Sequence, residues 1–145
     1  MRELAGMAGA LARVTRGGEG DTVVERLRAA RAEVVEALVG LVDPILLARC
    51  AGLFGAEPRL VSVAWVQAVQ ADPSGEDGAR FHAWTSVPRL TLRGAEAPES
   101  LRLAAAGALS VFDDEVLRAR FGDPVEVSLD RAGRIAVAPW EDPDG

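Results

Sequence analysis

The stretch at residues 60–93 constrains the fold most, because it contains β-type segments joined by a turn-forming linker. Residues 59–70 are rich in Val and predict one long strand. Residues 79–87 predict its partner, and residues 89–93 predict a continuation or a third strand. The linker at residues 72–78 consists of Asp, Pro, Ser, Gly and Glu, which suit turns. We therefore expect an antiparallel hairpin at the centre of the chain.

Alternation along these strands predicts what each face meets, because successive side chains point to opposite sides of a sheet. Both faces of residues 59–70 are mostly apolar, which favours a central strand. One face carries Val61, Val63, Trp65 and Val69 with Gln67, and the other carries Leu60, Ala64, Val66 and Ala68 with Ser62. The partner strand has a more polar face, which we expect to meet solvent or a ligand: Arg80, His82, Trp84 and Ser86.

Three helical segments are expected before the strands. Residues 2–15 carry apolar side chains three or four apart, and the Gly-rich residues 16–20 follow as a hinge. A second helix is expected from Asp21 or Thr22 to Gly40. A third should begin at Asp43-Pro44, an N-cap followed by a first-turn proline, and end near Gly55. Its apolar residues surround the helix, which predicts deep burial.

The second helix contains a seven-residue repeat, formed by Leu27, Val34 and Leu41. Such a repeat has two readings. The stripe either packs on the core of its own domain, as amphipathic helices usually do, or forms a seam for self-association.

The C-terminal half continues with two helices, near residues 99–112 and 115–121, and a hairpin of residues 125–129 and 134–138. The whole predicts an α+β fold, with N-terminal helices packed on a mostly antiparallel sheet. The expected order is three helices, two or three strands, two helices and two strands. We expect an N-terminal segment with its hinge (residues 1–20), one α+β domain (21–140) and an acidic tail (141–145).

Charge and composition exclude several classes of function. The net charge is −6 and the pI is about 4.8, so a general affinity for nucleic acid is not expected. All basic residues except His82 are Arg, and Lys is absent, which indicates codon bias of a GC-rich, bacterial genome. No apolar run approaches the roughly 20 residues of a membrane span. The single cysteine, Cys50, suits a reducing cytoplasm.

Little in the sequence points to catalysis or to a cofactor. Cys50 and His82 are the only thiol–imidazole pair, but Cys50 falls inside an apolar helix, where a buried, inert thiol is the ordinary outcome. The acidic residues 113–115 suit a helix N-terminus better than a metal site. The Gly-rich residues 17–20 lack the features of a phosphate-binding loop. We therefore expect no metal and no cofactor.

The order of elements, with helices, two or three strands, a helix and a hairpin, resembles small dimeric secretion-type chaperones. It resembles roadblock-type scaffolding domains less closely. The resemblance covers residues 22–139 and concerns topology alone. It implies a fold, and no functional residue follows from it.

Two hypotheses follow. The preferred one is a non-catalytic, cytoplasmic protein-binding module of chaperone, adaptor or immunity type, without membrane or nucleic-acid partners. It would bind another protein, or itself as a homodimer, through the sheet around Trp84 or through Leu27, Val34 and Leu41. The predicted binding residues are Arg80, His82, Trp84 and Trp65. The alternative is a small-molecule-binding or hydrolytic domain. Its pocket would lie between the sheet and the helix of residues 43–54. Trp65, Trp84 and His82 would line it, with Asp113 or Asp114 as acid or base.

Overall fold

The computed structural model describes residues 20–71 and 78–143. The predicted first helix and most of the hinge lie outside the described residues. The chain forms two compact units, Met1–Leu41 and Val42–Gly145, and the boundary falls inside a helix. The described part is an α+β fold with three helices and an antiparallel sheet, and the longest helix comes first.

Helix α2 (Gly20–Ala56) is one 37-residue helix, so the predicted break between Gly40 and Asp43 is wrong. Pro44 lies inside the helix, where it removes one backbone hydrogen bond. Asp43 does not begin a new helix. Its carboxylate instead accepts two hydrogen bonds of 2.8 Å from the guanidinium of Arg120. A charged partner from a distant part of the chain thus replaces the capping role that the local sequence suggested.

The joined helix also changes the expectation about membranes. Thr22–Ala56 is the one helix in the described residues that is long and apolar enough to cross a membrane, judged by length and composition alone. The sequence-based expectation that no such segment exists depended on the break at residues 40–43. Core helices of soluble proteins meet the same two criteria. Residues 37–56, the most apolar part of the helix, contain two charged residues, Asp43 and Arg49, and each would cost about 2.5–3.5 kcal/mol at the centre of a bilayer.

Within the second unit, α2 buries one stripe rather than its whole circumference. The buried residues follow helical spacing: Val42, Leu46, Cys50, Leu53 and Phe54. Ile45 and Leu47 remain exposed, so the expected all-round burial is wrong.

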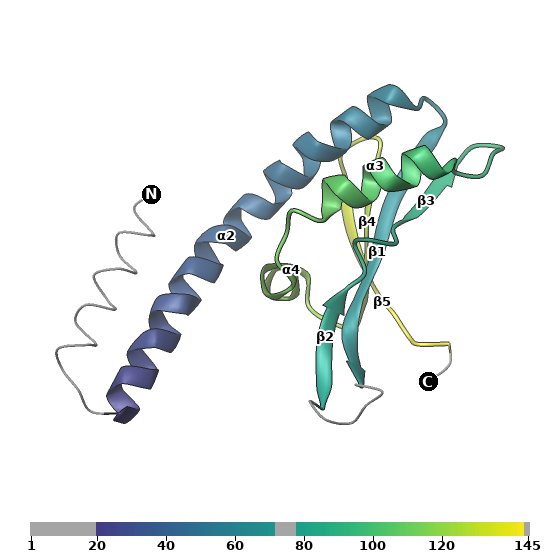
Figure 1. Ribbon diagram of the computed structural model, residues 1–145. Helices are drawn as coiled ribbons and strands as arrows, with labels where there is room; N and C mark the ends of the chain where they lie inside the picture. Colours follow the sequence, from purple (N-terminus) through teal and green to yellow (C-terminus); the bar gives the residue numbers. More distant parts are fainter. Residues whose placement is uncertain (1–19, 72–77, 144–145) are drawn as a thin grey trace. The chain divides into compact units, whose positions relative to one another are not determined.

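Five strands form the sheet: β1 (Leu60–Ala71), β2 (Ala79–Ala83), β3 (Arg89–Leu92), β4 (Val125–Asp130) and β5 (Ile135–Pro139). Strand β1 is central, as predicted. It pairs with β4 along one edge, and with β3 and then β2 along the other (Figure 1). All pairings, including that of β4 with β5, are antiparallel.

A β-bulge between Leu60 and Ser62 corrects the predicted faces of β1. The bulge shifts the alternation by one residue, so Leu60 shares a face with Val63 and both are fully buried. Val61 becomes exposed instead. The expectation that Val61 and Val63 share a face was therefore wrong.

Helices α3 (Glu99–Leu109) and α4 (Asp114–Phe121) connect β3 to β4. In α3 the buried residues are four apart: Leu101, Ala105 and Leu109. In α4 they are Val116, Leu117 and Phe121. Figure 1 shows α4 beside β1 and β2. The ring of Phe121 packs edge-on against Trp65 of β1, with centroids 5.8 Å apart. This side of the sheet is therefore the core.

The only fully buried polar side chain in the described core, Gln67, joins β1 to α4 and to the segment after it. Its amide oxygen accepts a hydrogen bond of 2.9 Å from Trp65 Nε1. Its amide nitrogen donates to the carbonyl oxygens of Leu117 and Gly122, at 2.9 and 2.8 Å. Gly122 has a φ of +83°, a conformation that favours glycine and ends α4. The polar interruption seen in the sequence thus has a structural reason.

Arg131, in the turn between β4 and β5, connects this turn to the end of α2 and the start of β1. The guanidinium of Arg131 donates to three backbone carbonyls, those of Phe54, Glu57 and Leu60, at 2.7–3.1 Å. One side chain thus satisfies acceptors at the end of α2 and at the start of β1. The helix C-terminus would otherwise leave such carbonyls without a partner.

We predict that Gln67→Leu lowers the free energy of unfolding by about 2–4 kcal/mol, because it leaves the Trp65 N–H and two buried carbonyls without partners. Urea denaturation measures the loss. Gln70→Leu, the same change at an exposed position of the same strand, should alter stability by less than about 0.5 kcal/mol. Equal effects of the two variants would contradict the role of the buried amide.

A second prediction concerns Asp43. A double-mutant cycle with Asp43→Asn and Arg120→Ala should give a coupling free energy of about 0.5 kcal/mol that decreases with salt, since both side chains are partly exposed. Asn caps helices as well as Asp does, so a capping role would give neither a cost for Asp43→Asn nor a coupling with Arg120. Thermal or urea unfolding in low and high salt distinguishes the two.

Candidate functional site

The side of the sheet opposite α4 forms the candidate binding surface, here called the open face. Trp65 and Gln67 point to the helices, so the alternate residues of β1, among them Val66 and Ala68, point to the open face. Ala68 pairs with His82 of β2, and Val66 accepts a hydrogen bond from the Trp84 N–H at 2.9 Å.

Three aromatic rings form a row on the open face. The rings of His82 and Trp84 are 5.9 Å apart, and those of Trp84 and Trp140 are 6.3 Å apart with planes inclined at 46°. Trp140 follows β5, and its N–H bonds the carbonyl of Pro124 at 3.2 Å. Strand pairing thus brings together two tryptophans from distant parts of the chain. Both indoles are half-buried, and His82 is exposed.

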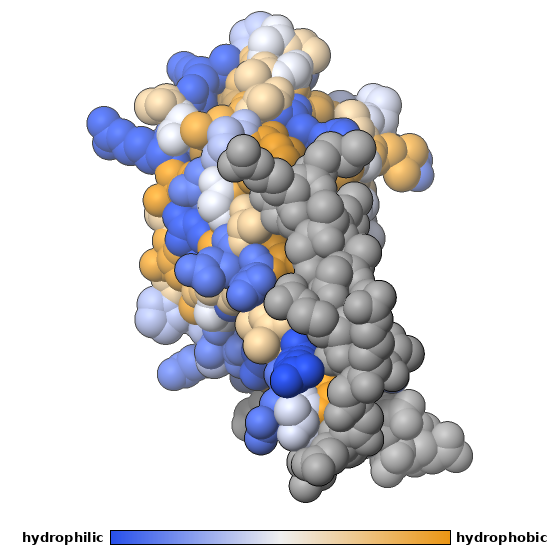
Figure 2. All heavy atoms as spheres, turned by 90° about the vertical axis from the view of Figure 1, so that its left-hand side faces the viewer, coloured by the Kyte–Doolittle hydropathy of each residue, from blue (hydrophilic) through white to orange (hydrophobic). Residues whose placement is uncertain are grey.

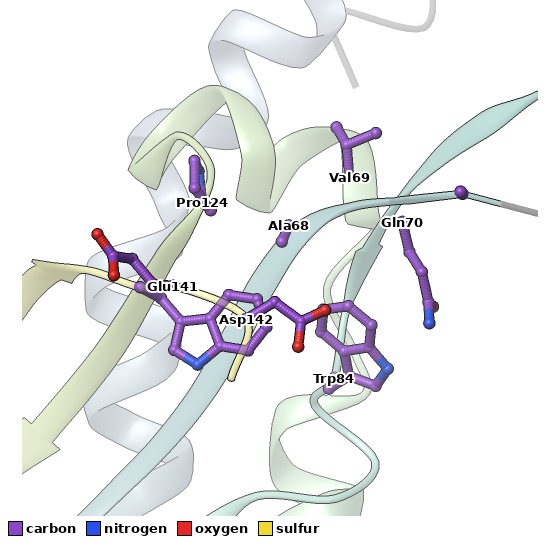
Figure 3. Close-up of a pocket in the computed structure, with 9 residues that line it drawn as sticks. Ala68, Val69, Gln70, Trp84, Pro124, Glu141 and Asp142 are labelled. Atoms are coloured by element: carbon purple, nitrogen blue, oxygen red, sulfur yellow. The ribbon is translucent and has the colours of Figure 1, made fainter. Parts of the chain in front are cut away.

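Two hollows lie beside the tryptophan pair, and both indoles line each of them. The larger, of about 840 Å³, is open and lies between the C-terminal segment and β1 (Figure 3). Its lining is Ala68, Val69, Gln70, Ala71, Trp84, Pro124, Trp140, Glu141 and Asp142. The smaller, of about 280 Å³, is lined by Trp65, Val66, Trp84, Val87, Arg89, Glu126 and Trp140.

Opposite charges meet across the open face beside the smaller hollow. Arg89 of β3 and Glu126 of β4 form an ion pair of 2.6 Å that crosses β1. Because the Arg89 side chain is 67% exposed, the pair contributes about 0–1 kcal/mol. Its main effect is that the positive charge of Arg89 is balanced by a carboxylate.

Of the four predicted binding residues, the structure places three on one face. Arg80 and His82 lie opposite Gln70 and Ala68 on the open face, and Trp84 follows them. Trp65 is separate: its side chain is 2% exposed and is directed to the helices, although the residue also borders the smaller hollow.

Sequence reasoning did not place Trp140 in this group. The alternation of Ala136, Ala138 and Trp140 was the available signal. With the register of β4 and β5, in which Ala138 pairs with Glu126, that alternation puts Trp140 on the open face.

The residues weighed for catalysis are not brought together. Cys50 is fully buried in α2, whereas His82 is exposed on the open face. Asp113 occupies the N-cap position of α4, as expected, but its side chain makes no capping hydrogen bond. Within residues 20–71 and 78–143, no group of three or more His, Cys, Asp or Glu could hold a metal ion.

A second surface lies on α2, in the first unit. Leu27 and Leu41, two of the three predicted interface residues, are 39% and 50% exposed, and Val34 is half-buried. Val24 and Leu38 lie on the same stripe and are 45% and 40% exposed. The space-filling view also shows apolar residues at the surface among hydrophilic ones (Figure 2).

Comparison of the chain with models of protein families, with curated proteins and with solved structures gave no match.

The environment of Cys50 gives a prediction about pH. Burial raises the pKa of the Cys50 thiol from 9.0 to about 11. A thiol whose pKa is higher in the folded state stabilises the fold below the unfolded pKa, and this contribution is lost as pH rises from 9 to 11. We expect a loss of about 2 kcal/mol over that range. Lys and Tyr, which would titrate there, are absent from the sequence.

Urea denaturation at pH 8, 9, 10 and 11 measures this loss, and Cys50→Ala should remove most of the pH dependence. A thiol reagent at pH 8 should label Cys50 only when the protein unfolds. Rapid labelling of the native protein at pH 8 would show that the thiol is accessible.

Proposed function

We propose that the chain is a non-catalytic protein-binding module that associates with a second copy of itself through α2. The observation that carries the proposal is the exposed apolar stripe of α2 in the first unit. The spacing between successive residues of the stripe is alternately three and four positions: Val24, Leu27, Arg31, Val34, Leu38 and Leu41.

The spacing of this stripe favours another helix as the partner. Steps of three and four correspond to the a and d positions of a coiled coil, at which each side chain enters a gap on a facing helix. The stripe covers 18 residues, about 27 Å at 1.5 Å per residue, which is long enough for several layers of contact. Burial stabilises such a pair by about 25 cal/mol for each Å² of apolar surface removed from water.

Arg31 favours an antiparallel arrangement of the two copies. Arg31 occupies an a position, and a parallel pair in register would bring two arginines side by side. In an antiparallel pair centred between residues 32 and 33, Arg31 faces Val34 of the second copy. In the same arrangement Val24 faces Leu41, and Leu27 faces Leu38. The interface then matches apolar residues and separates the two like charges.

The alternative, a pocket between the sheet and the buried part of α2, has less support. Trp65 is directed to the helices, while His82 and Trp84 are on the opposite side of the sheet. The two hollows beside the tryptophans are lined from the open face.

The test is the molar mass of the full chain over a concentration series, measured by light scattering after size exclusion. We expect a dimer of about twice 15.3 kDa, and a shift towards monomer for Leu38→Glu, which puts a charge into the seam. The matched control is Ala32→Glu, the same charge on another face of the same helix, which should remain dimeric.

A wild-type chain that stays monomeric at all concentrations would refute the proposal. So would equal behaviour of the two glutamate variants, because it would place the interface elsewhere. Circular dichroism of each variant shows whether the helix itself has been lost.

A further inference from the structure

The larger hollow on the open face combines two aromatic rings with two carboxylates. We propose that it binds the cationic side chain of a basic peptide segment, an arginine or a lysine, against Trp84 and Trp140. This inference goes beyond the proposed self-association, because it concerns another surface and another partner.

The tryptophan pair supplies the geometry for a cation. A guanidinium or ammonium group is attracted to the face of an aromatic ring within about 6 Å of its centroid, and Trp is the best such ring. The rings of Trp84 and Trp140 are inclined at 46° with centroids 6.3 Å apart, so they do not lie flat on each other. Both line the same hollow, where one cation can contact both.

The charges around the hollow favour a cation over an anion. Glu141 and Asp142 line it, and none of the described residues in its lining is basic. In Figure 3 these two residues come from the C-terminal segment, across the hollow from β1. The net charge of −6 also attracts cationic partners.

Three basic residues lie near the hollow: Arg80, His82 and Arg89. Arg89 borders only the smaller hollow, and Glu126 pairs with it. His82 packs against Trp84 from the neighbouring strand, and Arg80 lies further along β2. None of these three residues belongs to the lining of the larger hollow.

A peptide fits the two hollows better than a small organic cation does. The larger hollow, of about 840 Å³, exceeds the size of one ammonium group. The smaller hollow continues the surface on the other side of the indoles and offers Val66 and Val87 to an apolar side chain. A chain that crosses the tryptophan pair can put a basic residue on one side and an apolar residue on the other.

The experiment is a titration of the full chain with the blocked peptide acetyl-Gly-Arg-Leu-Arg-Leu-Gly-amide. The readouts are tryptophan fluorescence and calorimetry. Trp65 is buried in the core but also borders the smaller hollow, so calorimetry supplies the binding signal that does not depend on it. We expect saturable binding that weakens with salt. The same peptide with Glu in place of Arg should not bind. Tetramethylammonium chloride should bind at least tenfold more weakly.

Two variants locate the site. Trp84→Leu should weaken binding of the arginine peptide about tenfold, because it removes one aromatic face. Asp142→Asn should weaken it about threefold in low salt. Glu96→Gln removes one exposed carboxylate outside the hollow and should leave affinity unchanged. If Trp84→Leu does not fold, the affinities of Asp142→Asn and Glu96→Gln for the arginine peptide still test whether the hollow is the binding site.

Three results would overturn the inference: no saturable binding of the arginine peptide, equal loss of affinity in Asp142→Asn and Glu96→Gln, or tetramethylammonium binding as tight as that of the peptide. The last result would identify a site for free organic cations. Leu38→Glu, designed to disrupt the α2 seam, should bind the peptide as the wild type does, so the two proposals can fail separately.

Discussion

The buried amide of Gln67 is the interaction on which the rest of the second unit depends. A polar group without water or a partner costs several kcal/mol in an apolar core, so the amide must find its partners in the fold. Its three partners are the indole of Trp65 on the same strand, the Leu117 carbonyl of α4 and the Gly122 carbonyl after that helix. These bonds specify which side of β1 meets α4. Apolar contacts alone, which are non-directional, would do so less strictly.

Once that side is specified, the open face follows. Alternation along β1 directs Ala68 away from the helices, and the register of β2 and β4 adds His82 and Glu126 to the same side. Small residues on β1, Ala64 and Ala68, are almost fully buried there, so bulky neighbours cover them. The tryptophans thus shield part of the sheet while each indole remains partly accessible. A surface of this kind can bind a partner without rearrangement of the core.

The sequence predicted what depends on neighbouring residues and missed what depends on distant ones. Strand β1, the C-terminal hairpin and both short helices follow from local periodicity and from turn residues. Local signals also favoured a helix break at Asp43-Pro44, but Arg120, far along the chain, binds Asp43, and the helix continues.

Trp65 and Trp84 belong to one predicted hairpin, yet their side chains lie on opposite faces of the sheet. Both residues nevertheless border the smaller hollow. Trp140 was missed because its neighbours on the open face come from pairing of β4 with β1.

The two candidate surfaces differ in the kind of selectivity that their chemistry allows. The α2 stripe offers apolar side chains at a regular spacing, and spacing selects another helix of matching period more than any particular sequence. The hollow at Trp84 and Trp140 offers ring faces and carboxylates, and these select the charge of a side chain. Self-association would place two copies of the open face in one assembly. Two weak cation sites linked in this way bind a peptide with two basic segments more tightly than either site alone, provided that the peptide spans them. Dimerisation through α2 would therefore increase the affinity for such a long, bivalent peptide without adding a contact to either site.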